Sequence, residues 1–294
     1  DVGSTAPLQG PGGHSHKALP DCDFRFALLI TTSAEMKHAF LISVLAGCVA
    51  APVAAQTFAD VARAELDVGW RDSDGTHVAG LTISLAPGWK TYWRAPGDGG
   101  IPPSFNWSGS ENIVSVDVHY PVPEVFDQNG IQSIGYSEAV TFPLRIATKD
   151  SAAAIGLQGE IEIGVCEEVC IPVTLNVRAQ LPSGGSPSPA LRSVLADRPE
   201  RGGQMTCAIE PISDGLRMVV ETAVARHDGG NVVIIEVSEE GVWVSRAEVE
   251  HADGRLSAEV EMVPPTAKPF ALARSDVRMT ILSADRAIET VGCD

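Results

Sequence analysis

Two cysteines four positions apart, Cys166 and Cys170, lie inside a β-rich stretch that runs from Ile161 to Arg178. On a straight strand such residues are separated by roughly 13 Å, at about 3.3 Å per residue, whereas a disulfide needs Cα atoms within about 7 Å. A bond between these cysteines therefore requires the chain to reverse direction between them.

The residues that flank the two cysteines indicate the register of this reversal. Apolar positions on both sides match if residues 167–169 form a three-residue hairpin loop, with Val165 opposite Ile171. Cys166 then lies directly opposite Cys170. Because side chains alternate between the two faces of a sheet, both cysteines are predicted on the face opposite the apolar one, where a partner can reach them.

A disulfide across so short a loop contributes little to stability. The chain-entropy model gives about 2 kcal/mol for a five-residue loop and about 4.6 kcal/mol for a long one such as that closed by Cys207 and Cys293. The latter two cysteines enclose 87 residues. We therefore predict that Cys166 and Cys170 are a redox pair and that Cys207 and Cys293 form a structural disulfide.

A segment near the N-terminus has the layout of a secretory signal peptide. Met36, followed by Lys37, precedes an apolar run, and an A-x-A-like cleavage site ends at Ala55. We predict a signal peptide over residues 36–55, cleaved after Ala55, and an exported protein. Residues 1–35 are then expected to be a non-native upstream segment.

A lipoprotein anchored at Cys48 is the alternative, because Leu45-Ala46-Gly47-Cys48 resembles a lipoprotein box. This reading would leave a short export signal from Met36 onwards, whereas an apolar core alone takes about 7 to 15 residues. We therefore favour cleavage after Ala55.

The composition restricts the partners and the chemistry. The chain of 294 residues has a formal net charge of -17, which disfavours nucleic acid as a partner and favours basic protein surfaces. Four cysteines follow the predicted leader, and an even number in an exported chain favours disulfides over metal sites. The histidines show no zinc-binding spacing. We expect no metal and no other cofactor.

Short strands separated by turns occupy two regions of the sequence. We therefore predict an all-β protein in which each region forms a β-sandwich. The first region covers residues 56–182, and residues 183–200 have linker composition with a short helix near 190–197. The second region covers residues 201–294. Expected strands lie at residues 76–85, 113–119, 140–146, 159–165, 171–179, 216–223, 231–237, 241–249, 255–262 and 277–283.

Four aromatic residues, Trp89, Tyr92, Trp93 and Trp107, surround a Pro-Gly-Asp-Gly-Gly loop in the first region. Such a cluster can form a sugar platform or a cation-binding cage. We predict instead that these side chains pack in the core and against the loop.

Several motifs, taken in order, resemble the periplasmic N-terminal region of the DsbD/ScsB thiol-disulfide interchange proteins. They are GWKTYWRAPGDGGIPP at 88–103, YPVP at 120–123, GY at 135–136, FPL at 142–144 and CEEVCIP at 166–172. The likeness is strongest over residues 58–182. It implies an immunoglobulin-like fold, so that the expected architecture becomes two immunoglobulin-like β-sandwich domains in tandem.

The resemblance also implies a role for the cysteine pair. In that family an exposed pair takes electrons from a membrane-embedded domain and passes them to thioredoxin-like periplasmic partners, so Cys166 and Cys170 are the expected catalytic residues. By resemblance, Cys170 would form the mixed disulfide with the downstream partner. A cap loop with an aromatic side chain shields the pair in the family, and Phe126 and Tyr136 are the candidates here.

Two features depart from the best-known members of the family. Their cysteines are further apart than the C-x3-C spacing seen here, which is typical of the ScsB-like branch. Family members also continue into a multi-helix membrane domain and a thioredoxin domain, which this sequence lacks. We therefore expect a separately encoded, membrane-embedded electron donor.

Two acidic residues, Glu167 and Glu168, lie between the cysteines. Their negative charge should raise the thiol pKa values, which favours a low reduction potential and an electron donor rather than a strong oxidant. The alternative is a solvated turn without a redox effect. At the level of function, the alternative is a non-catalytic immunoglobulin-like adaptor whose disulfides are only structural.

Overall fold

The computed structural model describes residues 61–223, 231–284 and 286–294. The predicted signal peptide, the Cys48 alternative and the upstream segment lie outside these residues. Among the described residues, no helix is long and apolar enough to cross a membrane. Strands dominate this part of the chain, which confirms the all-β fold class.

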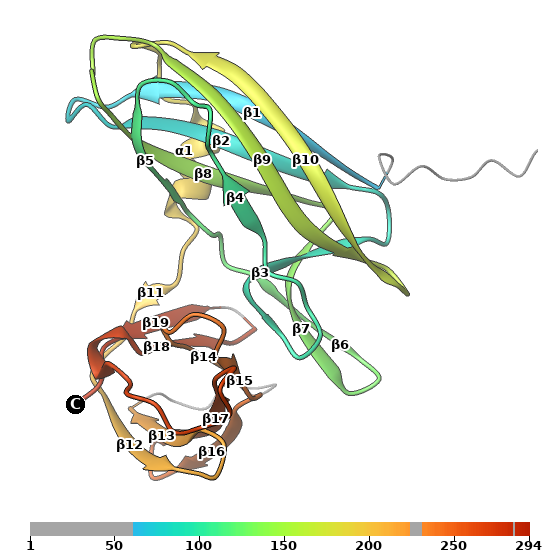
Figure 1. Cartoon of the computed structure of the whole chain (residues 1–294), viewed down its shortest axis with the longest axis vertical. Coiled ribbons are helices and arrows are strands. Elements are labelled where there is room, and N and C mark those ends of the chain that lie inside the picture. Colours follow the sequence, from blue (N-terminus) through green and yellow to red (C-terminus); the bar gives the residue numbers. More distant parts are fainter. Residues whose placement is uncertain (1–60, 224–230, 285) are drawn as a thin grey trace, which may run out of the picture. The chain divides into compact units, whose positions relative to one another are not determined.

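The first sandwich consists of two sheets, whose long hairpin strands are seen in Figure 1. One sheet has the order β1-β2-β8-β5, and the other has the order β10-β9-β3-β7-β6 with β4 beside β9. The bounds are β1 (Ala62–Arg71), β2 (His77–Leu85), β3 (Lys90–Gly97), β4 (Ser104–Asn106), β5 (Ile113–Val118), β6 (Glu124–Gln128), β7 (Ile131–Ser137), β8 (Ala139–Thr148), β9 (Ile155–Cys166) and β10 (Cys170–Leu181).

The core of this sandwich is built by the apolar side of each strand. Along β9 the isoleucines at 155, 161 and 163 are buried, while the polar residues between them are exposed. This alternation is the one that the sequence predicted. Trp93 and Phe142, which are also fully buried, fill the space between the two sheets.

The second sandwich has its own core and again two sheets. Their orders are β11-β19-β18-β14 and β12-β13-β17-β15, with β16 also paired to β17. The bounds are β11 (Glu200–Arg201), β12 (Met205–Pro211), β13 (Leu216–Thr222), β14 (Val232–Glu236), β15 (Trp243–Val244), β16 (Glu248–Ala252), β17 (Arg255–Val263), β18 (Arg278–Leu282) and β19 (Ala287–Val291). A disulfide joins Cys207 on β12 to Cys293, with Cα atoms 5.7 Å apart.

The predicted short helix is present as α1 (Pro189–Ala196). Proline is favoured in the first turn, and Ser188 caps the helix by accepting a hydrogen bond from the Leu191 amide. Leu191 is buried against Trp70 and Val78 of the first sandwich, so the helix is fixed by an apolar contact as well as by its cap.

One predicted strand is wrong in its extent. Residues 241–249 do not form one strand but contribute to two, β15 and β16, both paired with β17. Ser245 explains the break, because its side-chain oxygen accepts the Glu261 amide hydrogen bond at 2.9 Å in place of a backbone carbonyl. The backbone then leaves the ladder until Glu248.

Candidate functional site

The two cysteines lie at the tip of the β9–β10 hairpin. Cys166 ends β9, Cys170 begins β10, and the two are bonded with Cα atoms 4.2 Å apart. The ladder pairs Cys166 with Cys170 and Val165 with Ile171. This is the register predicted from the sequence, with a three-residue loop between the cysteines.

The exposure of the two cysteines differs, and this corrects the prediction that a partner can reach both. Cys170 is exposed, whereas Cys166 is only 2% exposed. Both residues are on the outward face of the sheet, so strand parity cannot account for the difference. Another part of the chain must cover Cys166.

Tyr92 on β3 contacts the Cys166 sulfur from the same outward face. Its hydroxyl lies within hydrogen-bonding distance of both sulfurs, 3.2 Å from Cys170 Sγ. Burial raises the pKa of Tyr92 above its ordinary value, so the phenol keeps its proton at neutral pH and can donate to a sulfur. The sequence predicted only a packing role for Tyr92 and missed this contact.

Two glycines make room for the Tyr92 ring. A Cβ atom added to Gly164 on β9 would lie 3.1 Å from the ring, and one added to Gly100 would lie 2.6 Å from it. The ring is therefore held between the outward face of β9 and the loop that follows β3. A residue with a side chain at either position would displace it.

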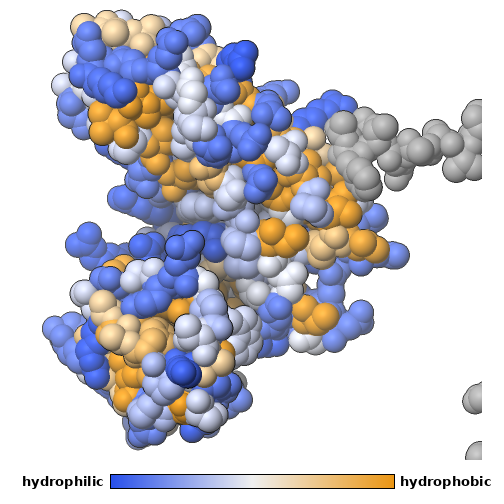
Figure 2. Space-filling model, in the orientation of Figure 1, coloured by the Kyte–Doolittle hydropathy of each residue, from blue (hydrophilic) through white to orange (hydrophobic). Residues whose placement is uncertain are grey.

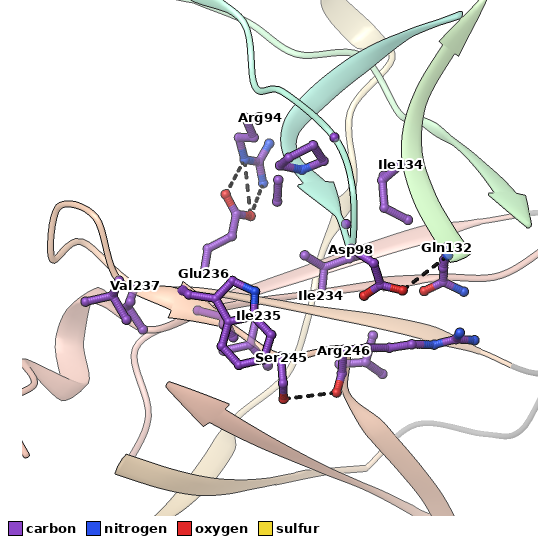
Figure 3. A pocket seen from close by; sticks show the side chains of 18 residues that line it. Arg94, Asp98, Gln132, Ile134, Ile234, Ile235, Glu236, Val237, Ser245 and Arg246 are labelled. Atoms are coloured by element: carbon purple, nitrogen blue, oxygen red, sulfur yellow. Dashed lines mark hydrogen bonds and ion pairs between the residues drawn. The ribbon is translucent and has the colours of Figure 1, made fainter. Parts of the chain in front are cut away.

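The loop after β3 continues this cover and is attached to β7. The Asp98 amide donates to the Gln132 carbonyl at 2.9 Å, and the Gln132 amide donates to the Asp98 carboxylate at 3.2 Å (Figure 3). Ile101, further along the loop, lies close to Gly164. A Cβ atom added to Gly164 would lie 2.7 Å from the Cβ atom of Ile101. The Pro-Gly-Asp-Gly-Gly motif thus forms a fixed cover beside the disulfide.

Lys90 connects the cysteine strand to the β6–β7 hairpin. It is paired with Cys166 in the ladder, and its ammonium group donates to Gln128 at 2.6 Å. The same group lies 5.0 Å from the centre of the Phe126 ring, a cation–π contact. Desolvation by burial lowers the pKa of Lys90. Phe126 is therefore attached to the site through Lys90.

Tyr136, the second predicted cap residue, is a core residue instead. Its hydroxyl donates to the Pro121 carbonyl at 2.9 Å, and its ring meets Phe142 edge-on. Only 5% of it is exposed. Tyr136 and Phe142 share the inner face of the sandwich, so Tyr136 cannot cover a disulfide on the outer face.

Both acidic residues of the hairpin loop, Glu167 and Glu168, are exposed. The Glu167 carboxylate approaches Gly88, where a Cβ would lie 3.3 Å from its oxygen. Gly88 has a φ of +85°, which a residue with a side chain rarely adopts. The turn before β3 therefore lies close to the loop between the two cysteines.

Apolar side chains are exposed on the elements that border the site. They are Ile101, Val125, Ile131 and Val169, between 39% and 69% exposed. On the face drawn in Figure 2, apolar surface lies in patches separated by hydrophilic surface. Exposed apolar groups around a reactive sulfur are suited to contact with another protein.

The described residues contain no group of three or more histidine, cysteine, aspartate or glutamate side chains that could hold a metal ion. The groups that the site itself offers are the two sulfurs, the Tyr92 phenol and the Lys90 ammonium.

Comparison with known proteins identifies the first sandwich. Residues 55–182 match the family described as "Thiol:disulfide interchange protein DsbD, N-terminal". No curated relative matches the sequence.

Among solved structures, the chain is similar to the N-terminal periplasmic domain of ScsB from Proteus mirabilis. The TM-score is 0.58 at 24% identity, over 80% of this chain and 95% of that one, and it shows a shared fold. A structure containing manganese lipoxygenase of Gaeumannomyces graminis and part of zonadhesin of Komagataella pastoris gives a TM-score of 0.17 at 12% identity, over 80% of this chain and 93% of that one. That second match carries no structural argument.

The family match, the ScsB-like fold and the disulfide at the hairpin tip agree with one another. The region from residue 55 to residue 182 therefore matches the sequence pattern of the DsbD N-terminal family and shares its fold with the N-terminal periplasmic domain of ScsB.

Proposed function

We propose that this protein relays electrons in the periplasm by thiol-disulfide exchange through Cys166 and Cys170, with thioredoxin-like proteins as partners. The observation that carries the proposal is the unequal exposure of the two sulfurs. A relay needs one sulfur that a partner can reach and one that resolves the mixed disulfide from within. Cys170 is exposed and Cys166 is covered by Tyr92.

The exchange has two steps. The Cys170 thiolate attacks a sulfur of the partner's disulfide, forms the mixed disulfide and releases the partner's other sulfur as a thiolate. The Cys166 thiolate then attacks Cys170 Sγ, which releases the partner's second thiolate and leaves the Cys166–Cys170 disulfide. Two electrons pass to the partner, and its thiolates take up the protons that the cysteines lost.

Tyr92 assists by donating a hydrogen bond to a sulfur that becomes negatively charged. A hydrogen bond to the charged form of an acid favours that form, so the phenol lowers the thiol pKa. Glu167 and Glu168 act in the opposite direction. Tyr92 therefore opposes the effect of the two glutamates on the thiol pKa. The low reduction potential was predicted from the glutamates alone.

The remaining elements of the proposal concern the surroundings of the pair. We take Phe126, held by Lys90, as the aromatic residue that shields the site. The Cys207–Cys293 disulfide is structural. Electrons reach Cys166 and Cys170 from a membrane-embedded donor, and the signal peptide over residues 36–55 directs export.

The experiment that tests the proposal is covalent trapping. Cys166→Ser leaves Cys170 to form a mixed disulfide that cannot be resolved, so we expect a stable adduct with a purified, oxidised thioredoxin-like protein on a non-reducing gel. Cys170→Ser is the matched control and should give no adduct. Equal trapping by both variants, or trapping by neither, would refute the assigned roles.

The adaptor alternative predicts a different response to reductant. Under mild dithiothreitol treatment, a relay should lose the Cys166–Cys170 bond and keep the Cys207–Cys293 bond, as judged by alkylation and peptide mapping. Equal resistance of both disulfides would instead support a non-catalytic binding module.

A further inference from the structure

The strand that carries Tyr92 is irregular immediately after this residue. Tyr92 is paired with Gly135 on β7, but the next pair joins Gly97 to Ser133. Five steps along β3 are therefore matched by two steps along β7, and the residues between Tyr92 and Gly97 lie outside the regular ladder. Bulges of this kind remove backbone hydrogen bonds that would otherwise fix a strand.

Arg94 lies within this bulge, and its side chain is bound by the second sandwich. Its Nε and Nη2 atoms donate to the Glu236 carboxylate of β14 at 2.9 and 3.0 Å. Nη2 also donates to the Glu289 carboxylate of β19 at 2.6 Å. Figure 3 shows the paired contact between Arg94 and Glu236. We call Arg94, Glu236 and Glu289 the Arg94 clamp.

The Arg94 clamp has features that distinguish it from an ordinary surface ion pair. The three side chains are only 19% to 23% exposed. The guanidinium carbon lies 3.9 Å from the centre of the buried Trp93 ring. A fork-shaped contact with a carboxylate, stacked on an aromatic ring, fixes both the position and the orientation of the arginine.

A fourth side chain balances the charge of the clamp. Arg278 on β18 contacts Glu289 at 3.4 Å, so that two arginines face two glutamates. Replacing Arg94 or both glutamates would leave partly buried charges without their partners. A buried charge without its partner is strongly destabilising, so we expect the strand that carries it to move.

We infer that the second sandwich positions the redox site through the Arg94 clamp, which fixes the β3 bulge and thereby holds the Tyr92 hydroxyl against Cys166 and Cys170. This inference rests on the proposed function. Arg94 is a positioning residue, because it acts on the sulfurs only through Tyr92, two residues earlier on the same strand. Without the clamp, the bulge relaxes and the phenol leaves the sulfurs.

The test compares clamp variants with a matched control in the full chain. Arg94→Lys, which cannot form the fork, and the double variant Glu236→Gln with Glu289→Gln break the clamp. Arg217→Lys is the control, since Arg217 contacts Glu259 and Glu261 entirely within the second sandwich. Circular dichroism and thermal unfolding establish that each variant is folded.

The first readout is the apparent thiol pKa of the reduced pair, followed by thiolate absorbance. We expect each clamp variant to raise it by about 1 unit, as the loss of a hydrogen bond to a charged group should. The Arg217→Lys control should leave it unchanged. The second readout is alkylation of Cys166 at a pH that ionises both thiols. A pKa rise of about 1 unit alone raises the rate about threefold through thiolate nucleophilicity, so we expect a rise of about tenfold in the clamp variants, the excess of which reports access.

A double-mutant cycle separates positioning from a general structural effect. If Arg94 acts through the Tyr92 hydroxyl, Arg94→Lys adds no further pKa shift in a Tyr92→Phe background. The inference would be overturned if the pKa shifts of Arg94→Lys and Tyr92→Phe were fully additive. It would also be overturned if the clamp variants, like Arg217→Lys, left the thiol pKa unchanged. Neither readout needs a partner protein, so failure of the electron relay and failure of the clamp give different results.

Discussion

At the scale of single residues, the main finding is the functional difference between two cysteines that are equivalent by strand parity. Tyr92 contributes to this difference, because its hydroxyl lies against the buried Cys166, whereas Cys170 stays exposed. Burial raises the pKa of Tyr92, which favours the protonated phenol that can donate to a sulfur. Reactivity at this site is therefore determined by a side chain from another strand.

Tyr92→Phe should raise the apparent thiol pKa of the reduced pair by about 1 to 2 units, because a hydrogen bond to a charged sulfur is worth about 1.5 to 3 kcal/mol. Thiolate absorbance measured against pH tests this. Tyr136→Phe is the control, since it removes a hydroxyl that contacts the Pro121 carbonyl rather than sulfur. The assigned role of Tyr92 fails if the two variants titrate alike.

His77 should make the stability of the protein depend on pH. Its side chain is fully buried, and desolvation lowers its pKa in the folded state below the ordinary value for histidine. As the pH falls below about 6.5, the unfolded chain binds a proton that the folded chain does not, so stability is lost. Denaturant titrations between about pH 7 and pH 5.5 should show this loss, and His77→Gln should reduce it. An equal slope in the variant would contradict the prediction.

At the scale of elements, the site is assembled from the β9–β10 hairpin, which could be predicted from the sequence, and strand β3, which could not. The β9–β10 hairpin has alternating apolar residues, so its register could be predicted from the sequence. Strand β3 has no such alternation and contains a bulge and a proline, and it was not among the expected strands. The strand that controls the chemistry was therefore the harder one to find.

Gly164 should be intolerant of a side chain, because the Tyr92 ring and Ile101 occupy the space above it. Gly164→Ala is expected to cost about 1 to 3 kcal/mol of stability by overpacking and to raise the alkylation rate of Cys166 in the reduced protein. Gly156→Ala on the same strand is the control, since its nearest neighbours would lie 3.4 Å away in ordinary contact. Equal unfolding midpoints for the two variants would count against the packing argument.

At the scale of the whole molecule, the second sandwich has its own core and its own disulfide. That disulfide joins the beginning of the sandwich to its end, where Arg274 also donates to the Cys207 carbonyl at 2.6 Å. The arrangement is suited to stability rather than to exchange. Through the Arg94 clamp, we infer that this stable sandwich also supports the redox site.

Replacing both Cys207 and Cys293 with alanine should lower the free energy of unfolding by about 2 to 5 kcal/mol, as expected for a native disulfide that closes a long loop. The thiol pKa values of Cys166 and Cys170 should stay unchanged at temperatures where the variant is folded. Denaturant unfolding and thiolate titration measure the two properties. A changed thiol titration in a folded variant would show that the two disulfides are coupled.

The sequence by itself determined the hairpin, the opposition of Cys166 and Cys170, the all-β class and the short helix, because each follows from local alternation, spacing or capping. It could not determine which cysteine is buried, the role of Tyr92, or the core position of Tyr136. These depend on which strands become neighbours, and pairing between distant segments is fixed by packing across the whole sheet. The chemistry of the pair was therefore readable from its spacing, but its asymmetry was decided only by the tertiary structure.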